Sequence, residues 1–385
     1  MSRRLAILGV LGMLACPAFA AHRVSFDQLQ QLLASAASQH KPDDSVALQV
    51  YDAEPVVRLS EADLTTLIAA SPGPKTTHAL RAFADESVFL DPPASEIPTR
   101  PTPDVAAQRY MMTQTIHYVA RTLHSLPNFL ATRETDSFDD APHVETAGQW
   151  PVRAGFRYQA SFEAPIAYRD GNEIDDAATR ATTGAVEEVA DHKKPRKPAP
   201  PAAPGLSSWG EFGPVLEILI LDASKGKLGW SRWGLYNGKL VAVFQFSIPQ
   251  SISHYNVQYK NRHVGETVGA YYGAGGNSSG LDKSPGSDIV REVAGYHGLL
   301  TIDPETGAVL RVSIEADLPA TSGLQKAAMM VEYAPVHIGD SEHICPVHSV
   351  TLSLVRDVYK DSPTAGLANI IDLQLNDVHF KDYRR

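Results

Sequence analysis

The sequence is poor in cysteine, and this restricts where its stability can come from. Only Cys16 and Cys345 occur in the 385 residues. We expect Cys16 to be removed with the N-terminal leader described below, which leaves one thiol and no internal disulfide. An exported protein without disulfides must be stabilised by a packed core. Hydrophobic residues make up 43% of the chain, which is typical of a globular protein.

The chain also lacks an excess of basic charge. Its formal net charge is −10 at pH 7. Removal of Arg3 and Arg4 with the leader leaves 32 Lys and Arg against 44 Asp and Glu, a charge of −12. Such an acidic protein is not expected to bind nucleic acid or anionic lipid headgroups as its main partner.

Long apolar segments are absent beyond the N-terminus, so we expect no transmembrane segment. Within residues 1–20, Arg3 and Arg4 precede an apolar run, and Ala18-Phe19-Ala20 has the form of a cleavage site. The apolar run is shorter than the roughly 20 residues that a membrane helix needs. The pattern predicts a signal peptide cut after Ala20 and an exported protein, periplasmic or secreted.

One alternative concerns the end of this leader. Met13-Leu14-Ala15-Cys16 loosely resembles a bacterial lipobox, which would place a lipidated Cys16 at the N-terminus of an outer-membrane lipoprotein. Met13 stands where leucine is usual, and Pro17 follows the cysteine. Simple cleavage is therefore the main prediction.

The first part of the mature chain has a helical period. Amphipathic segments beginning near Ser25, Ser60 and Lys75 are separated by helix breakers. They predict a small helical domain over residues 21–90. The five prolines in residues 91–104 predict a linker after it.

The period changes after a further helix predicted over residues 104–125. Apolar residues then alternate with polar ones, and turn signals such as Asp303-Pro304-Glu305-Thr306-Gly307 separate the segments. Hairpins join these segments, so the sheet should be antiparallel. Residues 105–385 are predicted to form an α+β domain, a curved half-barrel-like sheet with a few helices on one side. Flexible insertions are expected at about 169–207 and 269–287.

Aromatic residues concentrate in the middle of this domain. They allow two interpretations, a core between sheet and helix or a concave apolar pocket for a lipid or another amphiphile. The sequence leaves both open. The candidate pocket residues are Trp230, Trp233, Phe244, Phe246, Tyr255 and Tyr259.

A second group of residues could hold a metal ion. His337, His343, Cys345 and His348 flank a predicted hairpin turn, and imidazole and thiolate are the ligands that zinc prefers. Pro346 leaves the direction of His348 undetermined, and no acidic partner for these histidines is evident. The main expectation is therefore no metal, no cofactor and no catalytic residue. A metal-assisted hydrolase is the alternative.

Five segments carry a resemblance to known proteins. They are residues 126–135 (LPNFLATRET), 230–233 (WSRW), 243–249 (VFQFSIP), 255–259 (YNVQY) and 296–311 (YHGLLTIDPETGAVLR). Together they resemble a set of exported, uncharacterised acidobacterial proteins. The strand order and the D-P-x-T-G hairpin resemble the half-barrel superfamily of LolA-like and RseB-like proteins, which includes the outer-membrane lipoprotein carrier.

This resemblance implies a curved antiparallel sheet that holds an apolar ligand and performs no catalysis. We therefore expect a non-enzymatic envelope protein that binds a lipid, an acyl chain or a lipidated partner in its concave sheet. An interaction scaffold, with the N-terminal helices docking other envelope proteins, is a further alternative.

Overall fold

The computed structural model describes residues 22–140, 143–145, 155–174, 205–206, 210–260, 289–319, 323–358 and 369–385. The predicted signal peptide with Cys16, most of the predicted insertion at 169–207 and all of the one at 269–287 lie outside these residues. No helix in the described part of the chain is both long enough and apolar enough to span a membrane.

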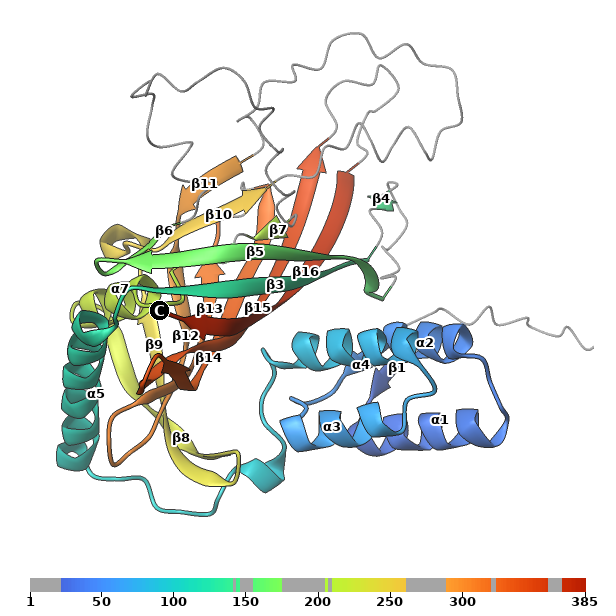
Figure 1. Ribbon diagram of the computed structural model, residues 1–385, viewed down its shortest axis with the longest axis horizontal. Coiled ribbons are helices and arrows are strands. Elements are labelled where there is room, and N and C mark those ends of the chain that lie inside the picture. Colours follow the sequence, from blue (N-terminus) through green and yellow to red (C-terminus); the bar gives the residue numbers. More distant parts are fainter. Residues whose placement is uncertain are drawn as a thin grey trace, which may run out of the picture.

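The N-terminal part of the chain is helical, as predicted (Figure 1). Ser25 and Gln28 form a capping box at the start of the first helix, and Ser60 caps the third. The second helix has little amphipathic character and was not predicted. The elements are β1 (His22–Val24), α1 (Phe26–Ser38), α2 (Asp43–Tyr51), β2 (Ala53–Pro55), α3 (Glu61–Ala69) and α4 (Pro74–Ser87).

The rest of the chain is built on one open antiparallel sheet. Within the described residues, eleven strands join in the order β6-β5-β3-β16-β15-β14-β13-β12-β9-β8, with β4 paired to β16. The end strands β6 and β8 do not pair with each other, so the sheet is not closed. The predicted fold class, α+β with a half-barrel-like antiparallel sheet after N-terminal helices, is confirmed.

Apart from the three-residue β4 and β6, the strands of this sheet are long, and most follow one another through hairpins. They are β3 (Phe129–Asp139), β4 (His143–Glu145), β5 (Arg157–Arg169), β6 (Asn172–Ile174), β8 (Lys227–Tyr236), β9 (Lys239–Ile248), β12 (Gly295–Ile302), β13 (Val309–Asp317), β14 (Leu324–Ile338), β15 (Ser341–Val358) and β16 (Asn369–Arg384). A smaller antiparallel sheet contains β7 (Gly205–Leu206), β10 (Asn256–Lys260) and β11 (Ile289–Val293). A short 3-10 helix, η2 (Gln250–Ile252), follows β9.

Different helices cover the two faces of the large sheet. The helices α5 (Val105–Ser125) and α7 (Pro214–Ala223) pack on one face, which we call the core face. Helix α4 of the N-terminal part packs on the other, which we call the cleft face. In Figure 1, α5 and α7 lie at the left and α1 to α4 at the lower right.

The sequence sets this division by alternation along the strands between their bulges. In β14, Met329, Val331 and Tyr333 join the core under α5 and α7, whereas Met330 lies on the cleft face. Gly307 in the β12–β13 turn has φ +73°, as its turn requires, and a Cβ there would lie 2.5 Å from the backbone of Gln114 in α5. This glycine therefore serves both the turn and the close packing of α5.

The predicted linker, residues 91–104, contacts the sheet. It contains a short 3-10 helix, η1 (Ala94–Glu96). The indole N–H of Trp233 in β8 donates to the carbonyl of Pro101 at 2.9 Å, and the Arg100 guanidinium lies 4.9 Å from the Trp233 ring centroid. These contacts hold the linker beside β8, next to the cleft described below.

Candidate functional site

A cleft of about 680 Å³ lies between the cleft face of the sheet and the N-terminal helices. Helices α3 and α4 form one wall, and strands β14, β15 and β16 form the other. Apolar side chains line much of it, including Leu59, Leu64, Ile68, Val88, Met330 and Val347. Charged side chains gather at one part, namely Arg58, Asp85, Glu96, Arg311, Glu332, His348, Asp377 and His379.

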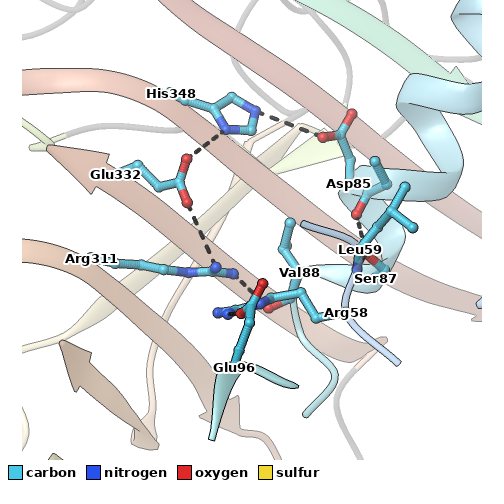
Figure 2. A network of polar contacts seen from close by, with 10 residues as sticks. Arg58, Leu59, Asp85, Ser87, Val88, Glu96, Arg311, Glu332 and His348 are labelled. Carbon is cyan, nitrogen blue, oxygen red and sulfur yellow. Dashed lines mark hydrogen bonds and ion pairs between the residues drawn. The ribbon is translucent and has the colours of Figure 1, made fainter. Parts of the chain in front are cut away.

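His348 of β15 is at the centre of this charged part, and Figure 2 shows its ring between Glu332 and Asp85. Its Nδ1 lies 3.3 Å from Oε2 of Glu332. Its Nε2 lies 2.9 Å from Oδ1 of Asp377 and 3.7 Å from Oδ1 of Asp85. Three carboxylates, from β14, β16 and α4, therefore surround one imidazole.

A bulge in β15 places this histidine. Tyr333 of β14 pairs with Pro346, and Glu332, the residue before it in β14, pairs with His348. Val347 therefore has no partner in β14 and is an extra residue in β15. Such a bulge changes which face the following side chains point to. It is the local feature that decides the direction of His348, which the sequence alone left undetermined.

Strand β16 adds Asp377 and His379. Residues two apart in a strand share a face, so both side chains point into the cleft. Nε2 of His379 lies 3.2 Å from the same Asp377 oxygen that contacts His348. The two imidazole rings stack with centroids 4.8 Å apart. Both Nε2 atoms thus converge on one carboxylate oxygen.

Arg311 of β13 connects this cluster to the N-terminal helices (Figure 2). Its guanidinium is buried, donates to the backbone carbonyl of Val88 at 2.7 Å and lies 3.6 Å from Glu332. Arg58 forms an ion pair with Glu96 beside it. Polar contacts therefore join the two parts of the chain across the cleft.

Burial and charge shift the pKa values of this cluster in opposite directions. Burial raises the pKa of Asp85 well above its usual range, and the nearby Asp377 charge adds to the effect. Burial alone would lower the pKa of His348, but its hydrogen bonds to Asp377 and Glu332 raise it well above its ordinary value. Burial likewise opposes ionisation of Glu332, yet the hydrogen bond from His348 and the Arg311 charge lower its pKa to about 2. The Glu332 and Asp377 carboxylates thus favour the cationic form of His348.

The predicted aromatic residues lie elsewhere, in the core under α5 and α7. Phe244 and Phe246 are 2% and 3% exposed. Trp230 packs edge-on against Phe244 and Trp233, and Tyr255 contacts Tyr296. Tyr259 lies in β10, in the smaller sheet. The structure brings the first five together as packing residues, and none of these five lines the cleft.

The four predicted metal ligands do not form one group. His337 is exposed and pairs with Glu342, whereas His343 pairs with Val336. Cys345 is buried in an apolar cluster that contains Phe129. Burial there raises the pKa of its thiol to about 12. Only His348 reaches the cleft, where it meets Asp377 and His379.

Five residues of this cluster were not expected from the sequence, namely Asp85, Arg311, Glu332, Asp377 and His379. A signal for two of them was present in the last strand. Its apolar phase at residues 371, 373 and 375 continues directly into Asp377 and His379. Charged residues in the phase of a buried face indicate a polar site, because an isolated buried charge is costly.

Comparisons with family models, with curated proteins and with solved structures found no match for this chain. The resemblance to exported acidobacterial proteins and to the LolA-like half-barrels therefore stays a prediction. The cleft and its lining are the basis for the function proposed below.

Proposed function

We propose that this is a non-enzymatic exported envelope protein that binds a lipid, an acyl chain or a lipidated partner in the cleft. The observation that carries the proposal is the cleft itself, which has a volume of about 680 Å³. Small-molecule sites typically measure about 300–1,000 Å³ and are frequent at domain interfaces. Its lining combines an apolar wall with a few convergent polar groups, as such sites do.

The lining suits a ligand with one apolar and one polar part. Leu64 and Ile68 of α3 line the cleft and would contact an acyl chain. His348 and Arg311 lie at the charged part and would contact a polar head. Burial of an apolar chain would supply most of the affinity, at about 25 cal/mol per Å² of apolar surface.

The core face offers much less room for a ligand than the cleft face. The proposed ligand site therefore lies on the cleft face, opposite the candidate aromatic residues. Helices α5 and α7 occupy the face over the aromatic residues, for which the sequence left a core and a ligand pocket both open. The space left there, between Tyr118, Leu216 and Tyr333, is about 20 Å³. A space of this size holds about one water molecule.

A binding experiment with oleate as the probe tests this proposal. Ala62 of α3 lines the cleft, and Ala69 lies on the same helix outside the cleft lining; both are exposed. Ala62→Trp places a bulky ring in the cleft and narrows it, and Ala69→Trp is the matched control. We expect native mass spectrometry and calorimetry to show oleate bound to the wild type and to Ala69→Trp, with affinity about tenfold lower in Ala62→Trp.

Two results would contradict the proposal. Equal oleate affinity in the two tryptophan variants would place the ligand outside the cleft. A wild-type protein that binds no oleate, and that yields no lipid on solvent extraction after expression, would show that the cleft is not a lipid site.

A further inference from the structure

We propose that His348, His379, Asp377 and Asp85 form a Zn²⁺ site at the charged part of the cleft. The site does not depend on the proposed lipid ligand, because its four residues come from this chain. It also differs from the group that the sequence suggested, with which it shares only His348.

The first support is the convergence of ligand atoms. His348, Asp377 and His379 each offer one ligand atom, and these three atoms lie within 4.8 Å of one another. The separations from Asp377 are 2.9 Å to His348 and 3.2 Å to His379. A tetrahedral zinc ion with bonds of about 2.0–2.1 Å separates its ligand atoms by about 3.3 Å. Small rotations of these side chains therefore open a tetrahedral site.

Asp85 supplies an independent second observation. Its side chain is 6% exposed and is aimed at His348, with Oδ1 at 3.7 Å from Nε2. Its other oxygen, Oδ2, is buried and accepts no hydrogen bond within the described residues. A buried carboxylate oxygen without a donor is costly unless something else satisfies it. A cation bound between Asp85 and Asp377 would do so.

Glu332 provides the outer contact that zinc-binding histidines usually have. A ligating imidazole commonly donates its other ring N–H to a carboxylate, which fixes the ring and its tautomer. Nδ1 of His348 lies 3.3 Å from Oε2 of Glu332, and Arg311 lies 3.6 Å from the other oxygen of Glu332. With Nδ1 engaged in this way, Nε2 is the atom left for the metal.

The donor set selects the type of metal. Two imidazole nitrogens and two carboxylate oxygens suit Zn²⁺, whereas Mg²⁺ and Ca²⁺ prefer oxygen ligands alone. All four residues line the cleft, so the ion can enter from solvent. Both Nε2 atoms must be deprotonated to bind it, so zinc binding should release protons.

Calorimetric titration of the tag-free, chelator-treated full chain with ZnCl₂ tests the inference. We expect about one ion bound per chain, release of protons detected in buffers of different ionisation enthalpy, and a rise in Tm, because an ion that binds only the folded state stabilises it. His379→Gln is the main variant because this side chain is 44% exposed, so it is the replacement that disturbs folding least. It should weaken zinc binding about 100-fold and abolish the rise in Tm.

Further variants separate a zinc site from other roles of the same residues. Glu332→Gln should weaken zinc binding about 10- to 100-fold, as loss of an outer carboxylate does. His297→Gln is the matched control, because His297 forms a comparable pair with Asp317 at 2.8 Å on the exposed surface. It should leave the zinc affinity unchanged.

Three outcomes would overturn the inference. The first is no zinc binding by the wild type, which would make the cluster a network of ion pairs only. The second is equal zinc affinity in His379→Gln and His297→Gln. The third is a loss of zinc in His343→Gln but not in His379→Gln, which would place the metal at the β14–β15 hairpin. If the wild type binds zinc but no oleate, the result contradicts the proposed function and leaves the zinc site in place.

Discussion

The two faces of the large sheet are stabilised in different ways. The core face is apolar and continuous from β8 to β14, and α5 and α7 close over it. On the cleft face, α4 packs on an apolar patch around Phe138, Met330 and Leu375. Beside that patch this face buries charged groups, among them Arg311 and Asp377. One face of the same strands thus serves packing, and the other combines packing with a polar site.

This difference has an energetic reason. Apolar burial is non-directional and contributes in proportion to area, so the core face tolerates many arrangements of its residues. Buried charges need specific partners, since a missing partner leaves a desolvated charge. The polar contacts of Arg311 with Glu332 and with the Val88 carbonyl therefore also define how the N-terminal helices sit on the sheet.

Truncation of one apolar residue on each side of the sheet tests the comparison most strongly. Phe244→Ala removes a ring that is 2% exposed, and we expect it to lower the free energy of unfolding by about 3–5 kcal/mol. Leu64→Ala, on the half-buried wall of the cleft, should lower it by about 1 kcal/mol. Urea unfolding followed by circular dichroism measures both values. Equal losses would mean that the cleft wall is packed as tightly as the core.

Removal of one charge tests whether the cleft face depends on specific pairs. Glu332→Leu leaves the buried Arg311 without its carboxylate, and we expect a loss of about 3 kcal/mol in urea unfolding with a chelator present. Adding Arg311→Met should restore part of that loss, because both charges are then gone. The control Glu163→Leu removes an exposed partner of Lys381 and should change the stability by less than about 0.5 kcal/mol. A double variant no more stable than Glu332→Leu would contradict this account.

The sequence predicted the core face well because that face obeys alternation. The apolar phase of β9, with Phe244 and Phe246 on one side, is the pattern that a half-buried strand requires. The caps at Ser25 and Ser60 and the turn at Gly307 were also readable, since each depends on a few neighbouring residues. That α5 covers the aromatic residues was not readable, because this helix is distant from them in the chain.

The cleft site could not be predicted for two physical reasons. Its ligand set joins Asp85 to His348 and Asp377, so it exists only once α4 has packed on β15 and β16. The direction of His348 also depends on the bulge at Val347, and a shift of one residue moves every later side chain to the opposite face. The phase of Asp377 and His379 was the one local signal.

Glu173 lies at the edge of the core face and should make the stability of the protein depend on pH. Glu173 and Glu211 both face Arg133, at 2.6 Å and 3.6 Å. Burial, with the Glu211 charge adding to it against the opposing effect of Arg133, raises the pKa of Glu173 to about 7. The folded protein therefore holds a proton that the unfolded chain has released above about pH 4.5. The stabilisation by this proton is fully present below about pH 4.5 and is lost as the pH rises towards 7. The free energy of unfolding should fall by about 2–3 kcal/mol over this range.

Glu173→Gln carries no titrating group and should remove this dependence. Urea unfolding at pH 4.5, 6 and 8 should show the variant gaining stability relative to the wild type as the pH rises. Glu163→Gln, at an exposed position, is the control and should follow the wild type. A wild type whose stability does not fall between pH 4.5 and 8 relative to Glu173→Gln would show that Arg133 fully compensates both carboxylates.

Helix caps give the smallest effect and the finest test of the comparison. Asp104 caps α5 by accepting from the Ala107 N–H at 2.7 Å, and Ser60 caps α3 by accepting from the Asp63 N–H at 3.1 Å. Replacing either by alanine should cost about 1 kcal/mol. Since α5 covers the core face, Asp104→Ala should lower global stability, whereas Ser60→Ala should mainly increase hydrogen exchange within α3. If Ser60→Ala lowers global stability equally, the helices beside the cleft unfold together with the sheet, and the two faces form one cooperative unit.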